Sequence, residues 1–298
     1  ICACLVGSEM CIRDRYYMWL TIGFSPCNPR KWDMLARYDS VQSFYKNMKE
    51  TERYMSKEEF VSLSSASLEQ AEGMLDYCRR KQIEVYCRED SAFPQKLREI
   101  SNPPSVLFTK GRLENVSFDK SAAVIGAREA DAYSESCARR ISAELAEAGI
   151  TVISGFAKGI DSAAHEGALY SGGKTAAVLG CGTEYDYPKN SFAKKKLISE
   201  KGVVISEYFP TQRPCPENFK VRNRICSALS DAVVCIQASA KSGALNTVYH
   251  ASEQGKDIFV LPPADIYAPE YQGQTALLRD GAEPLFSAAD VIERIKGG

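Results

Sequence analysis

The stretch SAAVIGAREADAYSESCARRISAELAEAGITVISG, residues 121–155, contains the pattern that decides the fold. Residues 122–125 are a short apolar run followed by Gly126, which predicts a buried strand that ends in a tight turn. Residues 134–148 carry apolar side chains at helical spacing, end at Gly149 and lead into a second apolar run at residues 150–153. The apolar positions of this helix are Cys137, Ile141, Leu145 and Ala148. A strand, a helix and a second strand in this order predict a pair of parallel strands joined by a helix.

The same alternation continues toward the end of the chain. Further strands are predicted at residues 175–179, 203–206, 232–236 and 258–261, and a short strand at residues 106–108 precedes the alternation. The helices between and after them are predicted at residues 161–170, 191–200, 222–229, 244–254 and 287–295. Short apolar strands that alternate with helices predict an α/β fold, with a mostly parallel, doubly wound sheet covered by helices on both faces.

Residues 16–88 follow a helical pattern, so we expect a small helical domain before an α/β domain at residues 89–298. Ser67, with Gln70 three residues later, predicts a capped helix start. The apolar positions of the three expected helices are Trp32, Leu35 and Ala36; Val41, Phe44, Tyr45 and Met48; and Ala71, Met74, Leu75 and Cys78.

Residues 1–15, ICACLVGSEMCIRDR, stand apart from both domains. The chain does not begin with Met, and this stretch resembles translated adapter sequence. We therefore expect residues 1–15 to be a non-native or disordered leader, and the alternative is a natural N-terminal segment.

Composition excludes several classes of protein. The net charge of the 298 residues is −1, so a nucleic-acid site would have to be a local basic patch. The 11 cysteines form no C-x-x-C pair and no cluster with the two histidines, so we expect no metal site, no cofactor and a reducing, cytoplasmic environment. No apolar run approaches 18 residues, which excludes a transmembrane helix.

The expected ligand site lies outside the carboxyl ends of the strands, where ligands of doubly wound sheets bind. The domain after residue 120 has 19 Lys and Arg against 21 Asp and Glu, yet several of its cations fall on or beside the loops at that edge. These cations are Arg128, Lys158, Lys189, Arg222, Arg224 and Lys241. A basic rim on an acidic domain predicts a polyanion groove, and the alternative is solvated charges balanced by Glu129, Asp161 and Glu207.

Three familiar motifs are incomplete. Gly173-Lys174-Thr175 precedes a strand and lacks the first glycine of a P-loop. Gly180 and Gly182 lack the third glycine of a dinucleotide fingerprint, and Ser154 is not in a G-x-S-x-G elbow. We therefore expect no catalytic residues and no enzyme activity.

An ordered set of motifs resembles a known family. The segment SGFAKGIDSAAHEGAL, residues 154–169, resembles the S-G-x-A-x-G-I-D-x-x-A-H-x-x-A-L signature of the DNA-processing protein A (DprA, or Smf) family. Residues 126–128, GAR, resemble its G-[ST]-R turn, with Ala in place of the hydroxyl residue. Matching elements follow in the family's order at residues 187–190, 206–207, 219, 222–225 and 242–243.

The resemblance implies an extended Rossmann-like fold after a helical domain similar to a sterile alpha motif (SAM). It also implies sequence-independent binding of single-stranded DNA, protection of incoming DNA, help in loading the RecA recombinase during natural transformation, and homodimers. Many members carry a C-terminal winged-helix domain, and we expect none in this chain, which ends at Gly298.

Arg128 is the first candidate for a phosphate contact, because its planar guanidinium can pair with two phosphate oxygens. The alternative is an ion pair with Glu129 or Asp131. The family places a phosphate-binding lysine and a base-contacting aromatic where Lys189 and Phe192 lie; the alternative for Phe192 is core packing.

Arg222 and Arg224 are two positions apart on a helix and diverge by roughly 200°. We expect one of them to reach DNA and the other to pair with an acid such as Glu207. The remaining candidate contacts are small residues at helix starts and the lysines beside them. This group comprises Gly126, Ser154, Gly155, Lys158, Gly159, Lys241, Ser242 and Gly243.

Two further side chains have structural roles in this interpretation. Asp161 is expected to cap its helix, and His165 to be a hydrogen-bonded structural imidazole. The alternative function is a nucleotide-binding Rossmann-type enzyme or sensor similar to phosphoribohydrolases. Residues 238–247, ASAKSGALNT, lack the P-G-G-x-G-T-x-x-E motif of those enzymes.

Overall fold

The computed structural model describes residues 12–26 and 28–297. The chain divides into two compact units, the first reaching Asp90 and including Ser101–Leu107, and the second made of Ser91–Ile100 and the residues from Phe108 onward. The sequence predicted a single boundary after residue 88. Residues 101–107 belong to the first unit because two hydrogen bonds connect them to it. The Asn102 side-chain amide donates to the Pro26 carbonyl, and the Trp32 indole N–H donates to the Pro103 carbonyl.

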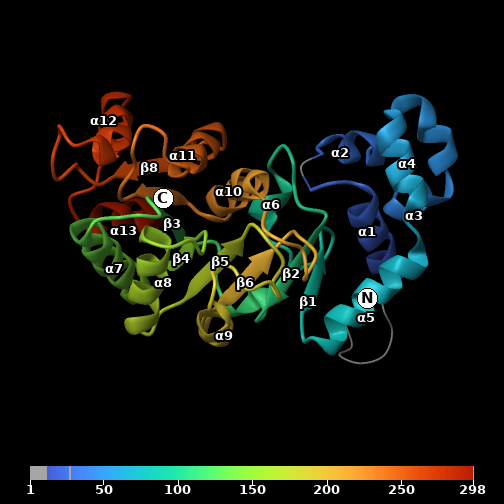
Figure 1. Cartoon of the computed structure of the whole chain (residues 1–298), viewed down its shortest axis with the longest axis horizontal. Helices are drawn as coiled ribbons and strands as arrows, with labels where there is room; N and C mark the ends of the chain where they lie inside the picture. The colour runs from blue at the N-terminus through green and yellow to red at the C-terminus, as the bar shows by residue number, and fades with distance from the viewer. Residues whose placement is uncertain (1–11, 27, 298) are drawn as a thin grey trace. The chain divides into compact units, whose positions relative to one another are not determined.

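The first unit is mainly helical, and Figure 1 draws its helices in blue to cyan. They are α1 (Ile12–Gly23), α2 (Arg30–Leu35), α3 (Val41–Lys46), η1 (Met48–Tyr54), α4 (Lys57–Ser65), α5 (Leu68–Arg80) and the strand β1 (Glu84–Cys87). The buried side chains of Trp19, Phe44 and Leu63 form its centre. Ser67 caps α5 in a capping box with Gln70, as predicted, and Ser56 forms a second capping box with Glu59 at the unpredicted helix α4.

Residues 12–15 were predicted to belong to a non-native or disordered leader, and the structure shows them as ordered helix. Helix α1 begins at Ile12, and the guanidinium groups of Arg13 and Arg15 pair with Asp90 and Glu72. These four residues are therefore helical and take part in the first unit, and residues 1–11 lie outside the described residues.

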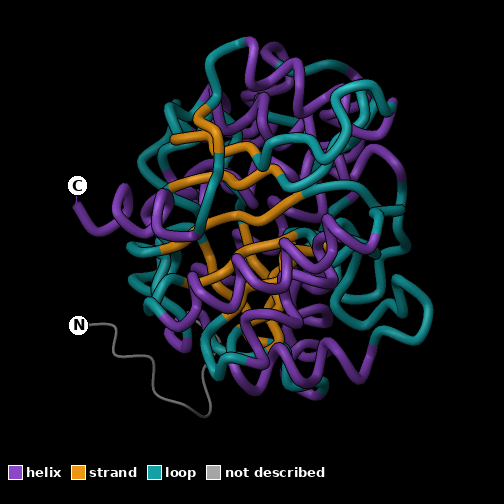
Figure 2. Tube along the Cα trace, turned by 90° about the vertical axis from the view of Figure 1, so that its left-hand side faces the viewer, coloured by secondary structure: helices purple, strands orange, loops and turns teal. Residues whose placement is uncertain are grey.

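The strands of the second unit follow the order β2-β6-β5-β4-β3-β7-β8-β9, and the first two residues of β2 belong to the first unit. The strands are β2 (Val106–Lys110), β3 (Ser121–Ile125), β4 (Thr151–Ser154), β5 (Thr175–Leu179), β6 (Val203–Ser206), β7 (Ala232–Cys235), β8 (Asp257–Val260) and β9 (Glu283–Pro284). Strands β3 to β9 pair in parallel, and β2 pairs with β6 antiparallel. Figure 2 shows the strands one beside the next. The predicted doubly wound, mostly parallel α/β fold after a helical region is confirmed.

Helices cover both faces of this sheet. They are α6 (Gln95–Arg98), η2 (Leu113–Asn115), α7 (Ala132–Glu147), α8 (Ile160–Tyr170), α9 (Phe192–Lys201), α10 (Pro216–Leu229), α11 (Ala244–Glu253), η3 (Pro269–Tyr271), α12 (Gln272–Arg279) and α13 (Ala288–Gly297). Figure 1 shows α7 and α8 on one side of the strands and α10 and α11 on the other. Within β3, Ala122 and Val124 belong to the apolar cluster formed with α7, α8 and α13. The alternate residues of a strand point to opposite faces, so both faces of β3 are apolar.

Helix α10 differs most from its prediction. It begins at Pro216, six residues before the expected start, because Pro at the first helical position needs no hydrogen-bond partner for its nitrogen. Arg222 and Arg224 therefore lie inside the helix and not at its start. Within residues 12–26 and 28–297, no helix has the length and apolar character needed to cross a lipid bilayer.

Candidate nucleic-acid interface

A cavity of about 900 Å³ lies at the carboxyl ends of β3, β4 and β7. Three loops line it, at residues 125–129 after β3, at Gly155 and Ala157 after β4, and at Ser239, Ser242 and Gly243 after β7. Helix α10 closes one side with Phe219, Lys220, Arg222 and Asn223. The connections from β3 and β7 leave on opposite faces of the sheet, so this is the point where doubly wound folds bind ligands.

Arg128 stands at the mouth of this cavity. Its side chain is exposed, and its guanidinium carbon lies 5.2 Å from the centroid of the Phe219 ring. Asp131, the acid considered as an alternative partner, instead caps α7 and accepts hydrogen bonds from Tyr271 and Gln237, both at 2.6 Å. The guanidinium is therefore held by an aromatic face and keeps its charge available for an anion.

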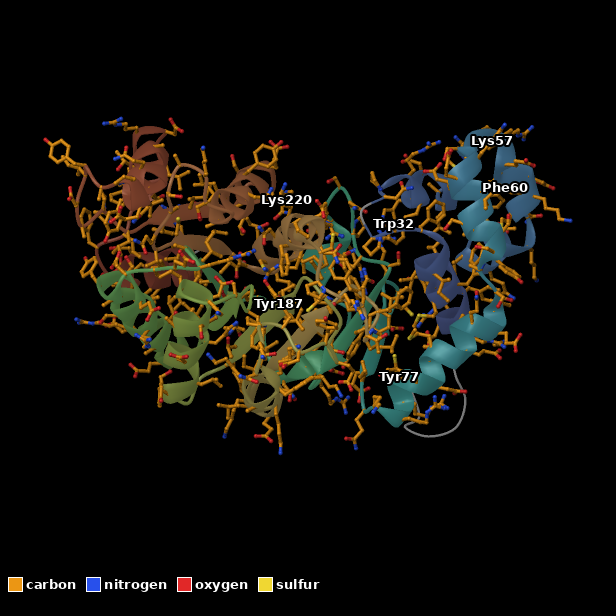
Figure 3. All side chains as sticks on the ribbon, viewed as in Figure 1. Trp32, Lys57, Phe60, Tyr77, Tyr187 and Lys220 are labelled. Carbon is orange, nitrogen blue, oxygen red and sulfur yellow. The ribbon has the colours of Figure 1, made fainter. Side chains whose placement is uncertain are left out.

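An aromatic pair stands behind Arg128. The rings of Tyr187 and Phe219 are 5.3 Å apart with an angle of 40° between their planes. Figure 3 labels Tyr187, from the loop after β5, and Lys220, an exposed cation of α10 at the same cavity. These three residues were not among the site residues predicted from the sequence. Tyr187 and Phe219 lie within the quoted family motifs, which was the available signal, and Lys220 was hidden because α10 was predicted to start after it.

Arg222 forms part of the cavity floor. Its side chain is 4% exposed, and Nη1 donates to the Val178 carbonyl at 2.6 Å. A Cβ atom at Gly155 would lie 2.0 Å from that Nη1 atom. Gly155, a predicted DNA contact, lines the cavity, and its missing side chain also leaves room for the guanidinium of Arg222.

Asp161 is the second buried charge at the floor. Its carboxylate is 7% exposed and accepts a hydrogen bond from the Ala157 backbone at 3.1 Å. Burial raises the pKa of Asp161, while the charge of Arg222 acts in the opposite direction. The carboxylate therefore orders the loop before α8, and it also faces the cavity.

Arg224 is the arginine that pairs with Glu207. Its two terminal nitrogens donate to the two carboxylate oxygens at 2.6 and 2.7 Å, and both side chains are buried. Arg224 does not line the cavity, so its predicted DNA contact is corrected to a structural ion pair. The helix rotation between positions 222 and 224 places the two guanidinium groups in different surroundings.

Several predicted contacts lie on the surface outside the cavity lining. Lys158, Lys189 and Lys241 are exposed. Phe192 is 52% exposed at the start of α9, which excludes core packing. The ammonium of Lys195 lies 5.6 Å from the centroid of the Phe192 ring and supports it from the protein side.

Ser154, Gly126 and Gly159 connect the strands and loops. The buried Ser154 hydroxyl donates to the Val124 carbonyl at 2.7 Å, so it does not reach a ligand. Gly159 has a φ of +69°, and a Cβ atom there would lie 2.4 Å from the Ala127 carbonyl oxygen. Ser154, Gly159 and Gly126 were all predicted DNA contacts. In the structure, Ser154 and Gly159 join the loops after β3 and β4. Gly126, Ser242 and Gly243 do line the cavity.

His165 is a structural imidazole, as predicted. Its Nδ1 lies 2.7 Å from the Thr175 hydroxyl, which itself donates to the Val152 carbonyl at 2.8 Å. The imidazole must therefore donate from Nδ1. Burial lowers the pKa of His165 to about 3, so the ring is neutral at physiological pH.

One group in the described part of the chain has the spacing of metal ligands, formed by Asp14, Cys87 and Asp90 in the first unit. It does not fit a metal site. Arg13 already pairs with Asp90, and burial together with the neighbouring carboxylates raises the pKa of the Cys87 thiol well above its usual value. A metal needs the thiolate, which this environment disfavours.

The sequence and the structure both match known proteins. The sequence pattern of the family described as DNA recombination-mediator protein A matches residues 84–296. The DNA processing protein DprA of Bacillus subtilis is 32% identical over 203 residues, which are 68% of this chain and 68% of that protein. The DprA of Streptococcus pneumoniae is 37% identical over 203 residues, 68% of this chain and 71% of that protein.

Solved structures agree with the sequence comparison. The X-ray structure of DprA from Streptococcus pneumoniae matches with a TM-score of 0.82 and 27% identity, over 95% of this chain and 98% of that one. DNA processing protein A from Helicobacter pylori, described for its single-stranded DNA binding mode, matches with a TM-score of 0.64 and 29% identity, over 72% of this chain and 96% of that one. With the family pattern covering most of the chain and the DprA fold reproduced across both units, the chain belongs to the DNA recombination-mediator protein A (DprA/Smf) family.

Proposed function

We propose that this chain binds single-stranded DNA, protects incoming strands and takes part in recombination during natural transformation. The observation that carries the proposal is the cavity at the switch point of the sheet, where Arg128 lies on Phe219 and Lys220 stands beside them. Guanidinium and ammonium groups bind phosphates, and aromatic faces stack with any base. The related protein from Helicobacter pylori is described as binding single-stranded DNA, which supports the same ligand class here.

A titration with labelled oligonucleotides tests this proposal. The protein is added to matched single-stranded and duplex 12-mers at several salt concentrations, and fluorescence anisotropy reports binding. We expect tighter binding to the single strand and a steep loss of affinity with salt, because released counterions drive phosphate binding. Equal, weak binding to both forms would contradict the proposal.

We infer that the chain is a binding protein and not an enzyme. Arg128, Arg222, Tyr187 and Phe219 are groups that bind and stack, while the buried His165 lies outside the cavity lining. Hydrolysis of a nucleoside monophosphate by the purified protein would overturn this inference and favour the phosphoribohydrolase-like alternative.

We also propose a cytoplasmic homodimer that passes DNA to the RecA recombinase. The family description as a recombination mediator supports this role. A pull-down of RecA by the DNA-loaded protein, compared with the DNA-free protein, tests the partner; no enrichment of RecA in either state would contradict it.

A further inference from the structure

The cavity combines three kinds of surface. Exposed cations stand at its mouth, namely Arg128 and Lys220. Its walls include the aromatic ring pair of Tyr187 and Phe219. Two opposite charges, Asp161 and Arg222, lie at the floor, and each side chain is more than nine-tenths buried. A ligand that fills this cavity meets cations first, then flat apolar faces, then a polar floor.

The two floor charges keep unused hydrogen-bonding capacity. Nε of Arg222 is buried without a partner among the described residues, although Nη1 is bonded to Val178 and approaches Cys226. A carboxylate has about four lone-pair sites, and on Asp161 the Ala157 N–H occupies one while the Ser154 side chain also bonds to this carboxylate. Arg224 and Glu207 show how the same two chemical groups bond when they pair directly, at 2.6 and 2.7 Å. Asp161 and Arg222 form no such ion pair among the described residues, and both line the cavity.

The ligand that satisfies this floor has adjacent donors for the carboxylate and adjacent acceptors for the guanidinium. It must also be flat, because the walls are aromatic. Guanine presents N1–H and the N2 amino group next to each other, and O6 and N7 as neighbouring acceptors. Adenine and cytosine each offer a single amino group, and thymine a single N–H between two carbonyls. Guanine is therefore the base that can use both oxygens of Asp161 and two nitrogens of Arg222.

We propose that this cavity holds one base of the bound strand and favours guanine, with Asp161 reading N1–H and N2 and Arg222 reading O6 and N7. The proposal rests on the proposed function, since it assumes that the strand reaches the cavity mouth. Binding of the rest of the strand stays general, because phosphate contacts at Arg128 and Lys220 carry no sequence information. The preference concerns the single position that enters the cavity.

The wild-type protein suffices for the decisive experiment. Anisotropy titrations compare a (dT)12 strand with strands that carry one central guanine, hypoxanthine, 7-deazaguanine, adenine or cytosine. We expect guanine to bind about tenfold tighter than thymine, in line with the discrimination of a bidentate contact. Hypoxanthine lacks the N2 amino group and 7-deazaguanine lacks the N7 acceptor, so each should lose part of the gain.

The outcomes separate the two proposals. If all strands bind with the same affinity, the proposed preference for guanine is wrong, while the proposed binding of single-stranded DNA is supported. If adenine or cytosine binds tightest, the assignment of the floor is also wrong. If no strand binds, the proposed function fails and the guanine proposal fails with it.

A pair of variants assigns the preference to Asp161. Asp161→Asn keeps an oxygen for the Ala157 N–H and presents an amide to the cavity, and an amide is complementary to adenine. We expect the guanine-to-thymine affinity ratio to fall to about one and the adenine ratio to rise. Glu147→Gln removes the same charge at an exposed position of α7 outside the cavity lining and should keep the guanine ratio. A guanine ratio that survives in Asp161→Asn would overturn the role of Asp161, and thermal melting confirms that each variant is folded.

Discussion

At the scale of single residues, Arg222 and Arg224 have different roles although they share one helix. Arg224 satisfies Glu207 inside the protein, while Arg222 reaches the floor of the cavity. Charge and position in the sequence are nearly the same for both. The difference comes from the surroundings of each guanidinium: Arg224 meets a carboxylate and Arg222 meets a backbone carbonyl, and a buried charge must be paired or strongly hydrogen-bonded.

Replacing Arg224 by Met should destabilise the protein by about 3 kcal/mol, because Glu207 would stay buried without its partner. Chemical denaturation of the variant and the wild type measures the change. The double variant with Glu207→Gln should recover much of the loss, since it removes the unpaired charge. A loss below 1 kcal/mol in the single variant would show that water reaches Glu207.

Arg128→Ala should weaken binding to all single-stranded sequences and lower the slope of log K against log salt by about 0.7, the share of one phosphate contact. Phe192→Ala should lower affinity by about 1–3 kcal/mol while the slope barely changes, because stacking releases no counterion. Anisotropy titrations over a range of salt measure both effects. Wild-type affinity and slope in Arg128→Ala would remove the main cation from the proposed interface.

At the scale of secondary-structure elements, the contact between the β4–α8 turn and α10 shapes the cavity. The turn contributes Gly155, and the helix contributes Arg222, whose guanidinium occupies the space that a side chain at position 155 would fill. The hydrogen bond from Arg222 to Val178 ties α10 to the end of β5 as well. The floor of the site is thus set by packing between elements that are distant in the sequence.

Gly155→Ala should destabilise the fold by about 1–3 kcal/mol, the usual cost of overpacking, and should weaken single-stranded DNA binding by displacing Arg222. Gly73→Ala is the matched control, because Gly73 lies inside α5, outside the cavity lining, and an added Cβ there meets nothing within 4 Å. Thermal unfolding and anisotropy measure both properties. Equal behaviour of the two variants would contradict the contact described for Gly155.

Helix α8 and strand β5 are joined by His165 and Thr175, and this link predicts sensitivity to acid. The pKa of His165 is about 3 in the folded protein and about 6.5 in the unfolded chain, so the unfolded state binds the proton first as pH falls. Stability contributed at this site is fully present above pH 6.5 and is lost progressively toward pH 3, by up to about 1.4 kcal/mol per pH unit.

The His165→Asn variant tests this origin of acid sensitivity. Urea unfolding at pH 7, 6 and 5 should show a smaller loss of stability with acid in the variant than in the wild type. The comparison uses the difference between the two proteins at each pH, so that carboxylates elsewhere cancel. Identical pH dependence would show that His165 is protonated in the fold.

At the scale of the whole molecule, the chain has two compact units with different kinds of core. The helical unit is centred on Trp19 and Phe44, and the α/β unit on a parallel sheet with helices on both faces. The candidate site lies entirely within the second unit. Exposed apolar side chains of that unit, among them Tyr267 at 86% and Phe286 at 80% exposure, are available for contact with a partner.

We expect the protein to be a homodimer, as the family resemblance implies. Tyr267 and Phe286 are exposed aromatic side chains, and an association that covered them would remove apolar surface from water and so favour a dimer. Sedimentation equilibrium over a range around 10 µM, an order-of-magnitude choice, measures the state because association depends on concentration. A monomer at every concentration would contradict the expectation.

The alternation of strands and helices, the sheet edge where the cavity lies and the family could all be predicted from the amino-acid sequence. Each of these depends on local patterns, namely apolar runs, helical spacing and glycine turns such as that at Gly126. The structural role of His165 was also predicted, because an imidazole inside an apolar helix face is most often hydrogen-bonded within the core.

Which candidate residues lie together became clear from the packing of the fold. The start of α10 at Pro216 sets the surroundings of Arg222 and Arg224, and the space left by Gly155 receives a guanidinium from a distant helix. Tyr187 and Phe219 come together from two separate segments. Contacts of this kind depend on how elements pack against one another, and the periodicity of a single element contains no information about the side chain it will face.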